Sequence, residues 1–222
     1  MPANDGSATP PSQPAVVRDA VLRWIVQGTL RPGDALPVEA VVARTGASAD
    51  AVRDALGELA ELGVARPDAD GVVIADPTAH NMAETDEIRH ILEDVAVRRF
   101  VQQATESQVG ALRRSLEAVE EVAARPDPAL EQLVRARDWF FVVMLRTAGL
   151  ATRDLLRNLR SHAGLVMSLA VAGPGRPAEV VEELRAIYLA LAARDAEAAI
   201  AACDRHRANS TDAGLKQLGN AT

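Results

Sequence analysis

Two polar side chains on helix-forming segments, Asp138 and His206, are of types that could contact a ligand. Asp138 falls on a helix face with three apolar residues, and His206 falls on one with two alanines and Cys203. Both side chains are therefore expected to point inward. A buried carboxylate requires a partner, because an unpaired charge is costly to desolvate. Two interpretations are open: Asp138 forms a structural pair with His206 or with an arginine, or the two residues contact a ligand.

Catalytic chemistry is not indicated by any motif. The sequence contains no G-x-S-x-G, G-x-G-x-x-G, H-E-x-x-H or P-loop pattern. The single cysteine, Cys203, lies on an alanine-rich helix face, where packing accounts for it. Adjacent carboxylates such as Glu120 with Glu121 and Glu182 with Glu183 fall on polar faces and are expected to be solvated. The sequence therefore predicts a protein that is not an enzyme.

Composition narrows the class of protein further. Of the 222 residues 48% are hydrophobic, and 24 Lys and Arg stand against 31 Asp and Glu, a net charge of −7. These values exclude a wholly disordered, collagen-like or disulfide-scaffold chain. One cysteine also excludes zinc-finger and iron–sulfur motifs. No run approaches the roughly 20 apolar residues of a membrane helix, and the first residues do not resemble a signal peptide, so we expect a cytoplasmic protein with no membrane partner.

Periodicity predicts a mainly α-helical protein in two units. Residues 1–13 are rich in Pro, Ser and Ala and predict a flexible tail. Residues 14–76 predict three helices followed by a small β-hairpin, which is the order of a winged helix-turn-helix domain. A linker is expected at 77–83, and residues 84–218 predict a bundle of about six helices.

Local signals place several boundaries within these units. Pro37 suits the first position of the second helix, Gly46 its end, and Ser48 can cap a third helix expected at 50–62. Two short apolar runs around an Asp- and Gly-rich turn predict the hairpin at 64–75.

The second unit has its own boundary signals. Thr105 followed by Gln108 has the pattern of a capping box. The later helices are expected at about 127–145, 151–170, 177–193 and 195–218.

Four stretches of the first unit carry a resemblance to a known family. They are VLRWIVQGTLRPGDALP (21–37), VVARTGAS (41–48), VRDAL (52–56) and LAELGVA (59–65). This part of the chain resembles the N-terminal domain of GntR-family transcription regulators.

The second unit resembles the FCD branch of that family. The stretches that carry this resemblance are EIRHILEDVAVRRF (87–100), RDWFF (137–141), YLALAARDAEAA (188–199) and DRH (204–206). Together the two resemblances imply a homodimer that binds double-stranded DNA, and a helical domain that binds a small organic acid, often through a metal. They also imply a repressor that the acid releases.

The resemblance implies that the third helix reads the major groove and the hairpin, or wing, contacts the minor groove. Ser48 and Arg53 match the family pattern, whereas Ala49 and Asp50 replace an arginine and a threonine. The candidate DNA contacts are Arg18, Arg23, Arg44, Ser48, Arg53, Arg66 and Gly71.

The negative net charge of the first unit weakens the prediction that it binds DNA. Residues 1–76 hold six arginines and eleven acidic residues, a net charge of −5, and Asp68 and Asp70 precede Gly71 in the wing. Because phosphate neutralisation dominates non-specific affinity, we expect weak DNA binding. The alternative is a metabolite-sensing or protein-interaction module that has lost direct DNA binding.

The family's metal site uses an aspartate and three histidines. Asp138 and His206 match two of these positions, but Val142 and Leu184 occupy the others and offer no lone pair. We therefore expect no metal and no other cofactor, unless residues such as His90, Glu93 or His162 substitute.

The effector-binding candidates that remain are Arg89, Glu93, Asp138 and His206. Arg89 matches an arginine found beside the family's ligand, and its planar guanidinium could bind a carboxylate through two hydrogen bonds. The alternative for Arg89 is a surface ion pair with Glu93, four residues later.

Overall fold

The structure is a computed structural model and describes residues 12–76, 82–162 and 164–219. The side chains of 82–86 and 160–162 are not described. The expected tail therefore lies almost wholly outside the described residues, as do most of the expected linker and the side chain of His162. Within the described part, no helix combines the length and apolar character needed to cross a membrane.

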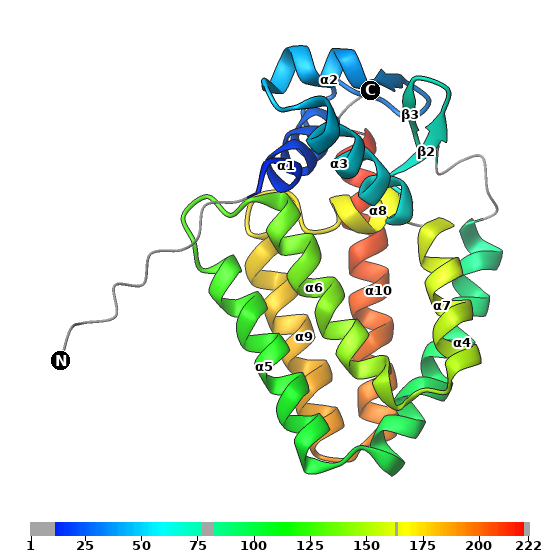
Figure 1. The fold of residues 1–222 in the computed structure, drawn as a ribbon. Helices are drawn as coiled ribbons and strands as arrows, with labels where there is room; N and C mark the ends of the chain where they lie inside the picture. Colours follow the sequence, from blue (N-terminus) through cyan, green and yellow to red (C-terminus); the bar gives the residue numbers. More distant parts are fainter. Residues whose placement is uncertain (1–11, 77–81, 163, 220–222) are drawn as a thin grey trace.

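A winged helix-turn-helix unit forms the upper part of the molecule in Figure 1. The Ser48 hydroxyl caps the third helix as predicted, and Gly46 ends the second with a φ of 68°. The elements of this unit are α1 (Gln13–Val26), β1 (Ala35–Pro37), α2 (Val38–Thr45), α3 (Ala49–Glu61), β2 (Ala65–Asp68) and β3 (Gly71–Ile74).

The wing has one more strand than the sequence pattern predicts. β1 pairs antiparallel with β3, so the sheet has the order β1-β3-β2. Pro37 ends β1 and caps α2, so its expected place at the first position of α2 was wrong by one residue. A Cβ at Gly71 would lie 2.4 Å from the carbonyl oxygen of Leu36. Gly71 therefore lets the two strands approach, whatever else it contacts.

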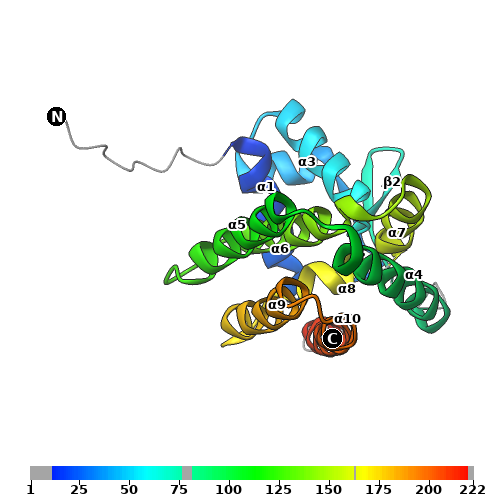
Figure 2. The ribbon, with the colours of Figure 1, turned by 90° about the horizontal axis from the view of Figure 1, so that it is seen from below.

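Long helices below this unit form the second domain, which the view of Figure 2 shows end-on. The capping box of Thr105 and Gln108 is present. The elements are α4 (Met82–Gln103), α5 (Glu106–Ala123), α6 (Leu130–Met144), the 3-10 turn η2 (Leu145–Thr147), α7 (Leu150–His162), α8 (Gly164–Leu169), α9 (Arg176–Ala192) and α10 (Ala196–Gly219).

Two helix predictions of this domain need correction. The helix expected from 127 begins at Leu130, because Ala129 takes the extended conformation of an N-cap. The helix expected over 151–170 is divided into α7 and α8. The described residues of this domain thus form seven α-helices rather than about six.

The two domains pack directly on one another, and α1 of the upper domain contacts α6, α8 and α10 of the lower one. A Cβ at Gly164, the first residue of α8, would lie 1.7 Å from the Leu62 carbonyl oxygen. Only a glycine permits this approach, so α8 begins in direct contact with the end of α3. Buried residues of both domains form one hydrophobic cluster, which includes residues of α3 and of the helical domain.

Candidate functional site

The N-terminal end of α3 buries Ala51 and Val52 and exposes the polar residues Asp50, Arg53 and Asp54. The Ser48 hydroxyl accepts a hydrogen bond from the Ala51 backbone N–H at 3.2 Å. Arg53, whose side chain is 60% exposed, pairs with Asp50 at 2.7 Å. Both predicted residues thus lie at exposed positions at the N-terminal end of α3, but the Arg53 charge is partly neutralised by Asp50.

Arg44 and Arg66 lie on exposed positions on either side of α3 in the sequence. The guanidinium of Arg44 stacks over the Trp24 ring, 3.6 Å from its centroid. This contact orients Arg44 while leaving it accessible. Arg66 is on β2, close in sequence to the exposed Asp68 and Asp70.

The structure overturns the prediction that Arg18 contacts DNA. Its side chain is 2% exposed, and it forms ion pairs with Glu131 at 2.5 Å and with Glu58 at 3.0 Å. Arg18 therefore joins the two domains and cannot reach a phosphate. Arg23 is partly exposed, and its hydrogen bond to Asp19 at 2.8 Å raises its pKa. Arg23 is thus directed along α1 rather than outward.

Three of the four predicted effector residues line one small cavity in the helical domain. Arg89, Glu93 and His206 surround a volume of about 50 Å³. Arg89 lies 3.6 Å from Glu93, which is the ion pair expected as the alternative. Small-molecule sites in proteins usually measure roughly 300 Å³ or more, so this cavity does not accommodate an organic acid in the present conformation.

Asp138 and His206 do not meet. Asp138 accepts a hydrogen bond from Arg137 at 2.8 Å. This is the pair with an arginine that the sequence analysis gave as one alternative. His206 lies 2.7 Å from the Glu183 carboxylate. The expectation that Glu183 is solvated was wrong, because its side chain is only 12% exposed. Its position one turn from Val180 and one turn from Ile187, both buried, was the signal that could have revealed this.

Glu183 is the centre of a buried polar network. Arg176 donates two hydrogen bonds to it, at 2.8 and 2.9 Å, and Asn209 donates one at 2.8 Å. Burial raises the pKa of Glu183, but the hydrogen bonds from His206, Arg176 and Asn209 outweigh it and hold the pKa at about 2. Burial lowers the pKa of His206, although Glu183 opposes this. At neutral pH a neutral imidazole thus donates to a carboxylate.

The family's metal does not fit these residues. The Val142 side chain is 44% exposed and Leu184 is fully buried, and neither supplies a ligand atom. Asp138 and His206 are each engaged with a different partner. The residues at these four positions therefore do not make up the family's set of metal ligands.

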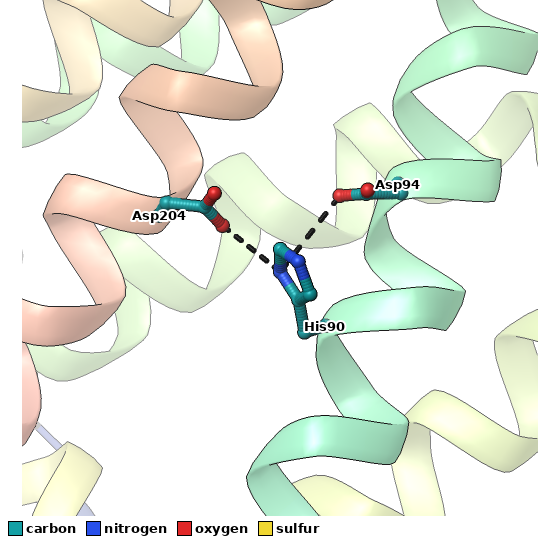
Figure 3. A group of neighbouring side chains, drawn as sticks. All are labelled: His90, Asp94 and Asp204. Carbon is teal, nitrogen blue, oxygen red and sulfur yellow. Dashed lines mark ion pairs between the residues drawn. The ribbon is translucent and has the colours of Figure 1, made fainter.

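A second group of possible ligand atoms joins α4 to α10 (Figure 3). The Nδ1 atom of His90 lies 2.9 Å from Asp204 and 3.9 Å from Asp94. The same oxygen of Asp204 also pairs with Arg207 at 2.9 Å. Because this guanidinium already supplies positive charge, we interpret the group as an ion-pair cluster.

A larger cavity of about 350 Å³ lies at the junction of the two domains. Asp138 lines it, together with residues of α6, α7 and α8 and the end of α3. Four of the lining side chains are arginines: Arg137, Arg146, Arg153 and Arg157. Sequence reasoning missed this cavity because its four arginines come from α6, η2 and α7, and only the packing of these elements brings them together.

Comparison with known families assigns both domains. The model of the bacterial regulatory proteins of the gntR family matches residues 15–67, and the FCD domain model matches 84–209. The chain belongs to the GntR family, in its FCD branch. This is a family of transcription regulators rather than of enzymes, and its N-terminal domain is a DNA-binding domain. No curated protein matches the chain.

Solved structures agree with this GntR fold over nearly the whole chain. The E. coli protein McbR/YncC has a TM-score of 0.64 at 20% identity, covering 93% of this chain and 99% of that one. A protein from Rhodococcus sp. RHA1 described as a GntR transcriptional regulator has a TM-score of 0.58 at 24% identity, covering 94% and 99%. At such identities the likeness supports the fold alone.

Proposed function

We propose that this GntR regulator acts as a homodimer that represses transcription until a small organic acid binds its helical domain. The observation that carries the DNA-binding part is the N-terminal end of α3, which Ser48 caps and on which Arg53 is exposed. Arg44 and Arg66 are the further cations that could contact phosphates. A ligand can release the DNA only by its different affinity for the two dimer arrangements.

The test is fluorescence anisotropy of the full-length protein on DNA from upstream of its own gene, against scrambled DNA, over a salt series. We expect binding to the upstream fragment that weakens as salt rises, because released counterions contribute much of the affinity. Absence of binding at low salt would contradict the proposal.

A second function is favoured by the acidic residues of the same surface. Asp50 neutralises Arg53, and the exposed Asp68 and Asp70 flank the tip of the wing. These residues suit a metabolite-sensing or protein-interaction module without direct DNA binding. The salt series separates the two functions, since such a module forms no DNA complex.

Reversing the charge of the wing should tighten DNA binding. We expect Asp68→Arg with Asp70→Arg to raise the affinity about tenfold at low salt, because two repelled carboxylates become two phosphate contacts. The matched control is Glu121→Arg with Glu182→Arg, which changes the net charge equally on exposed positions of the bundle. An unchanged affinity in the wing variant would show that these aspartates do not limit binding.

The proposed homodimer is supported by an exposed apolar face on α4. Ile88, Ile91 and Val95 recur at helical spacing and are 44%, 57% and 39% exposed. The neighbouring α7 exposes Leu150 and Leu155. Figure 2 shows α4 and α7 together at one edge of the molecule. Exposed apolar faces of this kind mark association surfaces.

A charge on this face should separate the protomers. We expect Ile91→Glu to change the mass measured by light scattering after size exclusion from that of two chains to one, because a carboxylate is poorly tolerated in an apolar interface. Leu189→Glu on α9 is the matched control, since Leu189 is also 57% exposed. A dimeric Ile91→Glu protein would place the interface elsewhere.

A further inference from the structure

We infer that the effector site is the 350 Å³ cavity at the domain junction, and that its ligand is an organic anion with at least two negative charges. This inference rests on the proposed control by an effector. It moves the site away from the 50 Å³ cavity beside Arg89, Glu93 and His206.

The charge of the cavity wall favours such an anion. Four arginines line it against two carboxylates, Glu61 and Asp138, so the wall carries a net charge of +2. Arg137 is neutralised by Asp138 at 2.8 Å. Arg157 is 76% exposed and pairs with Asp154 at the rim at 3.0 Å.

The two remaining arginines have no carboxylate partner within the described residues. The guanidinium of Arg146 lies over the Trp139 ring, 5.0 Å from its centroid. The Nε atom of Arg153 is buried and has no hydrogen-bond partner in the described part of the chain. A buried N–H donor without an acceptor is costly, and a carboxylate or phosphate oxygen in the cavity would supply the acceptor.

The rest of the wall sets the character of the ligand. Leu62, Val142, Leu145 and Met167 contribute apolar surface. A volume of about 350 Å³ lies within the range of small-molecule sites, roughly 300 to 1,000 Å³. The ligand class that fits is therefore a small dicarboxylate or phosphorylated acid with an apolar body, rather than an inorganic ion.

The position of the cavity links the ligand to DNA binding. Two residues of the cavity wall, Glu61 and Leu62, lie at the C-terminal end of α3. Ser48 and Arg53 lie towards the N-terminal end of the same helix. Gly164, which touches the Leu62 carbonyl, lies in the same wall. A ligand in this cavity lies beside the contact between Gly164 and Leu62, which holds the end of α3 against α8. An arrangement of the domains that changes this contact would therefore bind the ligand with a different affinity.

The test is calorimetric titration of the full-length protein, at constant ionic strength, with succinate, citrate, inorganic phosphate and acetate as probes. We expect succinate or citrate to bind and acetate to bind at least about tenfold more weakly, because one carboxylate meets only one of the two unpaired guanidiniums. Binding by none of the four probes, or equal binding of acetate, would overturn the inference. Phosphate binding as tight as that of the dicarboxylates would reduce the site to an inorganic-anion site and also overturn the proposed ligand class.

Single substitutions of the arginines test whether the anion binds in this cavity. Arg153→Gln should weaken binding of the dicarboxylate about tenfold or more, and the exposed Arg157→Gln should weaken it less while keeping the fold. Arg113→Gln on α5, 48% exposed and outside the cavity, is the matched control. Equal affinity in all three variants would place the anion elsewhere.

The DNA experiment distinguishes this inference from the proposed function. If the protein binds dicarboxylate through Arg153 but binds no DNA, the inferred anion site is supported and the proposed regulator function is contradicted. If the protein binds DNA but no anion, the regulator function is supported and the inferred anion site is contradicted.

Discussion

Arg18→Ala is expected to lower the free energy of unfolding by about 3 to 5 kcal/mol, because it leaves a buried carboxylate without its main partner. Glu131 is 5% exposed and receives two hydrogen bonds from Arg18, at 2.5 and 3.0 Å. Its other cation, Arg135, is 3.3 Å away on a side chain that is 60% exposed. The measurement is urea unfolding at pH 7 and fixed salt.

The contact also joins the domains, since Arg18 is on α1 and Glu131 on α6. We therefore expect the variant to weaken domain docking, seen as two separate transitions in place of one. Arg113→Ala is the control, because its pair with Glu117 is exposed on both sides and is expected to contribute little to stability. Arg18→Met with Glu131→Leu should recover much of the lost stability, as an apolar pair avoids the unpaired charge. A single variant as stable as the control would mean that water or Arg135 satisfies Glu131.

Glu183→Gln is expected to have the second large effect, about 3 kcal/mol at pH 7. The folded pKa of Glu183 is about 2 against an ordinary 4.5, and the difference corresponds to this free energy. The contribution is complete above pH 4.5 and is lost as the pH falls towards 2, because the unfolded chain binds the proton more tightly. Unfolding free energies measured at several pH values from 7 to 3 should thus fall in the wild type and fall less below pH 4.5 in the variant.

Protonation linked to His206 also lowers the stability as the pH falls, but at higher pH than that linked to Glu183. The folded pKa of His206 lies below the ordinary 6.5, so protonation of the unfolded chain favours unfolding as the pH falls through 6.5. His206→Gln should therefore remove the loss of stability that begins as the pH falls through 6.5 but leave the loss that Glu183 causes below pH 4.5. The control is His90→Gln, since His90 pairs with Asp204 and Asp94 (Figure 3) and not with Glu183. Identical pH profiles for the wild type and both network variants would contradict these assignments.

Much of the local structure was determined by the sequence itself. The caps formed by Ser48 and by Thr105 with Gln108, and the left-handed Gly46, depend on residues within one helical turn of each other. The winged-helix and helical domains follow from apolar spacing of the same short range, and the motifs that identify each domain lie in continuous stretches. These features were predicted because the interactions behind them are close in sequence.

The partners of charged residues were decided only by the tertiary structure. Arg18 and Glu131 are 113 positions apart, and Glu183 and His206 are 23 apart on different helices. Spacing along one helix shows that a side chain points inward but cannot show which group it meets there. The junction cavity depends on where α3, α6, α7 and α8 come together. Its charge is a property of that packing, because the arginines that line it are separated in sequence from Glu61 and Leu62.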